Sequence, residues 1–212
     1  MDVHMWLAFV VAASVLLVLP GPTVLLVVGC ALGGGARTAR ATVPGVVLGD
    51  GLALTLSLVG LGAVLAASAL LFTVLKLAGA AYLVYLGIRM WRSPAAAPHV
   101  PDAGLTGGAA GADRTLFLRA FFVTATNPKS IAFFVAFVPQ FLDHARPLGP
   151  QMFALGLTFT TLAAINTTAW ALLAGRARDA LRRPSWIRAL QRTGGALLVA
   201  AGVATASLRR AV

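Results

Sequence analysis

The sequence predicts an all-α membrane protein with six transmembrane helices, arranged as two inverted three-helix repeats with broken first and fourth helices. Three observations predict this fold. The chain of 212 residues is 59% hydrophobic and only 11% charged, whereas soluble domains carry about 25% charged residues. The stretches from Val3 to Ala36 and from Pro147 to Gly175 contain no charged residue, which is typical of membrane-spanning helices. Prolines and glycines also recur at matching spacings in the two halves.

Composition excludes several other classes. The net charge of +11 would suit a soluble nucleic-acid-binding protein, but the long uncharged stretches would not, so we expect no nucleic-acid partner. A single Cys30 provides neither a disulfide framework nor a cysteine-rich metal site. The start, Met1 to His4, lacks the positive region of a cleaved signal peptide. We therefore expect an uncleaved first helix.

Hydropathy divides the chain into six apolar segments, most of them at or above the roughly 20 residues that cross a bilayer core. The expected spans are residues 5–32, 42–67, 69–91, 119–142, 149–174 and 193–208. Their length favours helices over the alternating pattern of a membrane β-barrel.

Arginines in the loops indicate the orientation. Twelve of them follow the first, third and fifth spans, against three on the opposite side. The twelve are Arg37, Arg40, Arg89, Arg92, Arg114, Arg119, Arg176, Arg178, Arg182, Arg183, Arg188 and Arg192. Cytoplasmic loops carry the excess of positive charge, so we expect a multi-pass protein of the cell (inner) membrane with both termini outside. Segment 176–192 either lies on the inner membrane surface, against anionic lipids, or forms a solvated basic loop.

Residues 93–113, rich in Pro, Gly and Ala, are expected to form a flexible cytoplasmic linker between a first repeat, 1–92, and a second, 114–212. Pro22 and Pro128 lie 106 positions apart, as do Pro44 and Pro150. Gly79 and Gly87 share their spacing of eight with Gly194 and Gly202. Three spans per half turn the second copy upside down, and inverted repeats with broken helices are typical of secondary transporters.

The two breaks are the strongest local signals. Pro20-Gly21-Pro22-Thr23 interrupts the first span and Thr126-Asn127-Pro128-Lys129 the fourth. Proline removes a backbone donor and clashes with a preceding carbonyl group, and the freed polar groups need protein or a watery cavity around them. Two simple proline kinks are the alternative interpretation.

Ionisable side chains inside membrane helices are costly and are therefore candidates for function. Asp50 lies about 12 Å and Lys129 about 15 Å from the cytoplasmic ends of their helices, near the middle of a core about 30 Å thick. They form either a structural ion pair or a site in which Asp50 exchanges protons or binds an ammonium group, while Lys129 and Asn127 hold a carboxylate. Lys76 is nearer the outer surface and is interpreted as an anchor or a packing residue rather than a ligand.

Other polar positions leave two interpretations open. Tyr82 lines the pathway or packs at an interface, and Gly45 with Gly49 forms a GxxxG face that would permit a homodimer. Asn166 and its neighbouring threonines bond across helices or face a cavity. No Ser/His/Asp set, HExxH motif or phosphate-binding loop is present, so we expect neither an enzyme nor a bound cofactor.

These motifs resemble the LysE/RhtB superfamily of amino-acid exporters over nearly the whole chain. Pro20-Gly21-Pro22 resembles the family's PGP motif, although Thr23 stands where many members have Asn. LKLAGAAYLVYLGIRMWRS (75–93) is similar to the GAAYL signature, and FVTATNPKSIAFFVAFVPQF (122–141) to the N-P-K…P-Q-F pattern. Both segments look closest to the threonine/homoserine-type RhtB branch.

The resemblance implies export of a small neutral amino acid, in exchange for protons. Asp50 matches an aspartate that many members carry, whereas residues 161–164 lack the acidic residue that some relatives have in the fifth span. Asp50 is thus the expected proton-coupling residue. Alternatives are a cation or heavy-metal exporter of the same superfamily and a membrane scaffold without substrate, although one cysteine and no histidine in the spans make a poor soft-metal site.

Overall fold

The computed structural model describes residues 1–19, 21–93, 109–143, 145–176 and 184–207, and within these ranges the chain is helical, without strands. The helices are α1 (Val3–Val18), α2 (Pro22–Gly34), η1 (Ala36–Thr38), α3 (Ala39–Ala67), α4 (Ala69–Arg92), α5 (Ala109–Ala125), α6 (Pro128–Ala136), η2 (Val138–Phe141), α7 (Leu148–Arg176) and α9 (Pro184–Ser207). The predicted all-α class is confirmed.

Three described helices are long and apolar enough to cross a membrane by themselves, and they lie in α3, α4 and α7. Two bent pairs raise the number to five if each pair is one span: α1 with α2, bent by 53°, and α5 with α6, bent by 41°. The sixth expected span, 193–208, falls largely on α9, which is not among these helices; its first half carries Arg188 and Arg192. The described residues therefore contain three to five candidate spans, and the sixth span and the inverted repeat stay predictions.

One segment differs from its expectation. Residues 109–113, assigned to the linker, form the first turns of α5, because two alanines there favour helix. Asp113 also forms an ion pair with Arg40 at 3.1 Å, which fastens this turn to the start of α3. The remainder of the expected linker, 94–108, lies outside the described residues.

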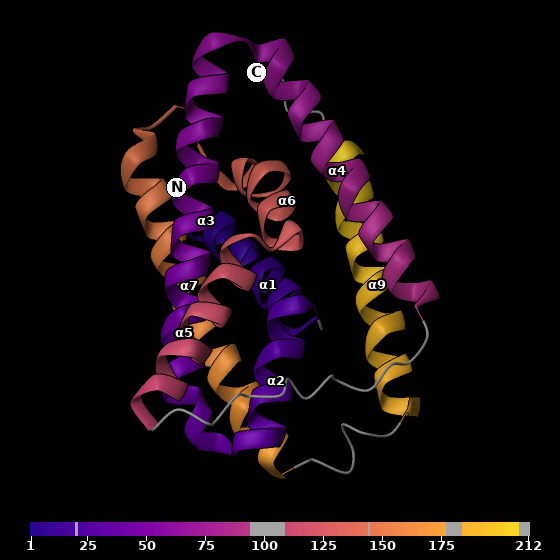
Figure 1. Cartoon of the computed structure of the whole chain (residues 1–212). Coiled ribbons are helices and arrows are strands. Elements are labelled where there is room, and N and C mark those ends of the chain that lie inside the picture. The colour runs from indigo at the N-terminus through magenta and orange to yellow at the C-terminus, as the bar shows by residue number, and fades with distance from the viewer. Residues whose placement is uncertain (20, 94–108, 144, 177–183, 208–212) are drawn as a thin grey trace.

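The helices pair through small residues. A Cβ atom at Gly45 would lie 2.5 Å from the Phe117 carbonyl oxygen, and one at Gly49 would lie 2.6 Å from that of Phe121. The GxxxG face predicted as a possible dimer surface is thus covered by α5 of the same chain (Figure 1). The possible homodimer stays a prediction, but without the support of this face.

A second close pair, α4 with α9, stands beside the other helices in Figure 1. A Cβ atom at Gly87 would meet the Gly195 carbonyl oxygen at 2.6 Å and Val199 at 2.8 Å. Towards the other end of the pair, a Cβ atom at Gly202 would meet Ala80 and Val84, each at 2.7 Å. Glycine allows the two backbones to touch at both places.

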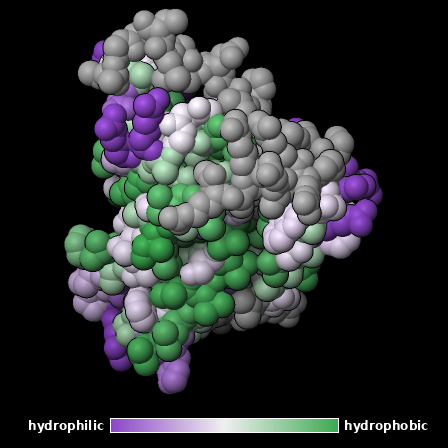
Figure 2. All heavy atoms as spheres, turned by 90° about the horizontal axis from the view of Figure 1, so that it is seen from below, coloured by the Kyte–Doolittle hydropathy of each residue, from purple (hydrophilic) through white to green (hydrophobic). Residues whose placement is uncertain are grey.

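The interior is aromatic and aliphatic, and so is much of the surface. Phe9, Phe133, Phe134 and Phe159 are fully or almost fully buried and pack at the meeting point of α1, α6 and α7. Large apolar side chains also point outward, with Leu70 75% exposed. Figure 2 shows hydrophobic residues over much of the visible face, with hydrophilic ones nearer its rim. Exposed apolar side chains along the helices, such as Leu56, Leu70 and Phe153, suit contact with lipid rather than water.

The helix ends that carry basic residues lie together. Residue 37 lies in η1 and residue 40 at the start of α3; residues 89 and 92 lie at the end of α4, 114 and 119 on α5, and 188 and 192 on α9. In Figure 1 all these stretches lie in the lower half of the molecule. The predicted one-sided distribution of arginines therefore holds for the described residues.

Candidate functional site

Both predicted breaks are present, and they have the same construction. After the first break α2 begins at Pro22, with Gly21 as the N-cap; after the second, α6 begins at Pro128, with Asn127 as the N-cap. Proline suits the first position of a helix because its missing N–H would lack a partner there. Pro20 lies outside the described residues.

Hydrogen bonds join the two breaks to each other. The Asn127 side chain accepts a hydrogen bond from the Lys129 amide at 3.1 Å, which caps α6, and donates one to the Thr23 hydroxyl at 3.2 Å. The Thr23 hydroxyl also lies 3.2 Å from that of Thr124, at the end of α5. The beginning of α2 is thus bonded to both sides of the second break.

The ammonium group of Lys129 is buried and bonded to backbone. It donates to the carbonyl oxygens of Leu16 and Leu19, at 3.0 and 2.9 Å, in the last turn of α1. The last carbonyl groups of a helix have no partner within it. Because α1 ends inside the protein, these carbonyl groups need a hydrogen-bond donor from another part of the chain. A cation at this end is also favoured by the helix dipole.

Two further residues complete this end of α1. The Asn166 amide donates to the Leu17 carbonyl oxygen at 2.9 Å. Gly21 leaves room for the lysine, because a Cβ atom there would lie 3.1 Å from Nζ and 3.3 Å from Cε. The φ angle of Gly21 is −138°, which any residue can adopt, so the need for glycine at this position is steric.

Asp50 lies on α3, 2% exposed, in the same region. Lys129 and Ser130 line the same cavity as its carboxylate. Its Oδ1 atom has no hydrogen-bond partner among the described residues, where the ion pairs found are Arg40 with Asp113 and Arg146 with Asp143. Asp50 and Lys129 are thus neighbours without forming the direct ion pair that was the alternative interpretation.

A small cavity lies between these groups. Its polar lining comes from four helices and consists of Thr23, Asp50, Asn127, Lys129, Ser130, Asn166 and Thr167. Val24, Val27, Val46 and Trp170 are part of its apolar lining. Its volume of about 20 Å³ holds roughly one water molecule. A molecule larger than water therefore fits between these groups only if the side chains or helices that line the cavity move.

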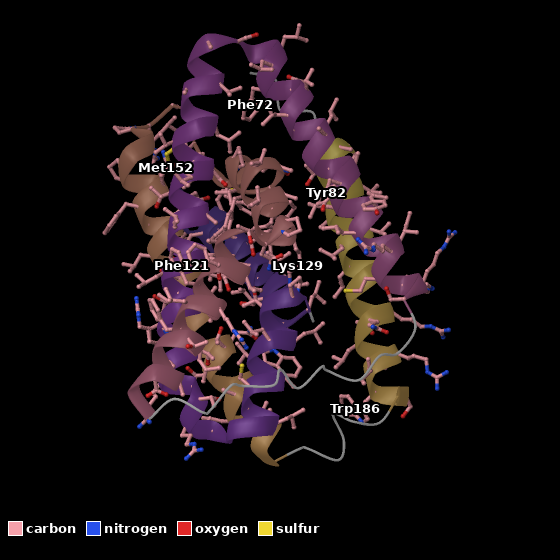
Figure 3. All side chains as sticks on the ribbon, in the orientation of Figure 1. Phe72, Tyr82, Phe121, Lys129, Met152 and Trp186 are labelled. Carbon is pink, nitrogen blue, oxygen red and sulfur yellow. The ribbon has the colours of Figure 1, made fainter. Side chains whose placement is uncertain are left out.

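The structure brings together most of the predicted site residues. Thr23, Asp50, Asn127 and Lys129 line the cavity, while Gly21, Pro22 and Pro128 shape the breaks beside it. Tyr82 does not line the cavity. It is 37% exposed on α4, and its ring lies 5.9 Å from that of Tyr85 (Figure 3).

Sequence reasoning missed several contributors. Asn166 was left open between two roles and fulfils both, since it bonds across helices and lines the cavity. Thr167, one of the neighbouring threonines given the same two interpretations, lines the cavity. Ser130 was missed, although it could have been found as a polar residue within an apolar span. The carbonyl groups of Leu16 and Leu19 carry no side-chain signal, so no pattern in the sequence could have indicated them.

The fold and this buried polar site define the class of protein, a multi-pass helical membrane protein with its site where broken helices meet. The family model described as "LysE type translocator" matches residues 14–208. The chain belongs to this family.

Three relatives illustrate the similarity. A "Homoserine/homoserine lactone efflux protein" of Salmonella typhi is 35% identical over 212 residues and covers 100% of both chains. An "Uncharacterized membrane protein" of Vibrio cholerae is 34% identical, covering 99% of this chain and 100% of the relative. A "Leucine efflux protein" of Enterobacter sp. is 32% identical over 64% of this chain and 62% of its own. No solved structure matches.

Proposed function

We propose that the protein is a secondary active transporter that exports small neutral amino acids of the threonine/homoserine type from the cytoplasm by proton antiport. The observation that carries this proposal is the buried carboxylate of Asp50, which shares a cavity with Lys129 where two broken helices meet and has one oxygen without a partner in the described part of the chain. Buried ionisable groups of this kind mark transport pathways and proton relays. Relatives named for efflux of homoserine and of leucine support the substrate class.

Symmetry supports the inverted repeat and a sixth span in α9. Adding 115 to Ala80, Val84 and Gly87 gives Gly195, Val199 and Gly202. These are the partners observed: Gly87 approaches Gly195 and Val199, and Gly202 approaches Ala80 and Val84. A two-fold axis between two helices makes the same contact occur twice, with equivalent residues of the two helices exchanged. Pro22 and Pro128, each of which opens a helix after a break, lie 106 positions apart and fit the same pairing of the two halves, although at a different offset.

The orientation follows from charge. Because the basic helix ends lie on one side, the positive-inside rule assigns that side to the cytoplasm of the inner membrane and both termini to the outside. The substrate then enters from the arginine-rich side, where residues 37, 40, 114 and 119 stand.

In the transport cycle Asp50 exchanges the proton. A carboxyl group that takes up a proton from outside and releases it to the cytoplasm couples inward proton flow to outward substrate flow. In this proposal Lys129, the capped start of α6 and Asn127 bind the substrate carboxylate. Val24, Val27 and Val46 offer an apolar wall for a short side chain.

Efflux from cells preloaded with labelled homoserine, threonine and leucine tests the proposal. Wild type is compared with Asp50→Asn, and with Asp113→Asn as the control, since Asp113 undergoes the same chemical change outside the cavity. We expect efflux that depends on external pH in wild type and the control, and at least a tenfold loss in Asp50→Asn. Unchanged, pH-dependent efflux in Asp50→Asn would remove its coupling role. Absence of any amino-acid efflux would turn attention to metal cations and then to a scaffold.

A further inference from the structure

The carbonyl groups at the end of α1 bind hydrogen-bond donors, and side chains of this chain already occupy them. Leu16, Leu17 and Leu19 direct their carbonyl oxygens at side chains of the second half of the chain, at 2.9 to 3.0 Å. Two of the three are held by one ammonium group, that of Lys129. Carbonyl pairs at a helix end suit a primary ammonium group, which has three N–H donors and a positive charge for the negative end of the dipole.

The surroundings fit the same ligand. Gly21 gives the ammonium group its space, because a Cβ atom would lie 3.1 Å from Nζ. The buried Asp50 lines the same cavity and keeps one oxygen unpartnered in the described part of the chain, although Lys129 is near. A buried acceptor without a donor is costly. The cavity thus contains two places for a cation, one occupied and one unsatisfied.

We propose that the carbonyl groups of Leu16 and Leu19 form the subsite for the α-ammonium group of the transported amino acid, and that Lys129 occupies this subsite as a tethered substitute while substrate is absent. The proposal rests on the proposed function and deepens it. When the amino acid enters, its ammonium group takes over the two carbonyls. The released Lys129 then pairs with the substrate carboxylate, close to Asp50. Only hydrogen bonds and ion pairs are exchanged.

The position of Lys129 in this subsite explains why the cavity is so small, because the lysine side chain fills the space that the substrate would use. It also allows the empty protein to close. Bare carbonyl groups cannot be left unsatisfied within the membrane, so a carrier returning without cargo needs another donor for them. Lys129 supplies that donor.

The test uses methylammonium as a probe on the purified full-length protein in nanodiscs. Removing the tether in Lys129→Ala opens the subsite, so saturating methylammonium is expected to raise Tm by about 3 °C. Wild type and Lys129→Gln should not respond, because an ammonium or amide group already occupies the carbonyls. Tetramethylammonium has no N–H donor and should stabilise none of the three. Folded Lys129→Ala that ignores methylammonium, or an equal response in wild type, overturns the proposal.

A second measurement needs no variant and applies even if Lys129→Ala fails to fold. Wild-type Kd values are compared for homoserine and leucine and for their N,N,N-trimethyl derivatives, which keep the charge but lack N–H donors. We expect at least tenfold weaker binding of the derivatives, and equal affinity overturns the ammonium subsite. Efflux measured in parallel keeps the two ideas separate. Normal efflux with a negative probe result removes only the subsite, whereas absence of efflux removes the proposed function.

Discussion

The ammonium group of Lys129 lies 2.9 Å from the carbonyl oxygen of Leu19, so a side chain of the fourth span satisfies the broken end of the first span, 110 residues earlier. This single contact ties the two broken helices together. It also makes the two breaks depend on each other, because the carbonyl groups freed at the first break need a hydrogen-bond donor from the second.

Removing this donor is expected to destabilise the protein. Lys129→Met leaves the two carbonyls without their partner, at a cost of about 1–3 kcal/mol for each unsatisfied group. Lys129→Gln keeps N–H donors and should lose less. Thermal unfolding of the two variants in the same detergent checks the order. Equal stability of Lys129→Met and wild type would show that water replaces the ammonium group.

Gly21→Ala tests the steric requirement beside the lysine. The added Cβ atom would lie 3.1 Å from Nζ, so the ammonium group must shift by a few tenths of an ångström and its hydrogen bonds must lengthen. We expect several-fold slower efflux with nearly unchanged expression. Gly60→Ala is the matched control, because a Cβ atom there meets nothing within 4 Å. The same loss in both variants would contradict the steric explanation.

The symmetric contact between α4 and α9 predicts matched effects. Gly87→Ala brings a Cβ atom to 2.6 Å from the Gly195 carbonyl oxygen, and Gly202→Ala brings one to 2.7 Å from that of Ala80. Overpacking of this kind costs about 1–3 kcal/mol, so both variants should lose similar stability. Thermal unfolding checks this, with Gly62→Ala as the control at a site without neighbours. A large loss in one variant alone would argue against the two-fold relation.

Asn127 has two roles that substitutions can separate. Asn127→Ala removes the cap of α6, which is worth about 0.5–2 kcal/mol, together with the bond to Thr23. Asn127→Asp keeps an acceptor for the cap but loses the amide donor. We therefore expect Asp to retain more thermal stability than Ala, while both reduce efflux. If Ala matches wild type in unfolding, the cap contributes nothing to stability.

Tyr82 was predicted as a site residue but lies outside the cavity. Because its ring lies on α4 outside the cavity, against Tyr85, Tyr82→Phe should leave the rate of efflux within about twofold of wild type, the usual range for surface changes. Thr23→Val, which removes a hydroxyl that lines the cavity, should reduce it more. Initial efflux rates at matched expression decide between them.

The sequence by itself determined the class, the breaks and the residues most costly to bury. Uncharged apolar segments of this length indicate helices that cross a lipid bilayer. Proline interrupts a helix at its own position, so the two breaks could also be read from the sequence alone. Asp50, Asn127 and Lys129 stood out since charges and amides are expensive inside a membrane.

Only the tertiary structure decided which groups these residues meet. The acceptors of Lys129 are carbonyl oxygens more than a hundred residues away, and every residue has a carbonyl, so no side-chain pattern marks them. The use of Gly45 and Gly49 against α5, and the position of Tyr82 outside the cavity, likewise depend on how helices pack. Helix packing is set by the combined shape of distant surfaces, which spacing along one segment does not contain.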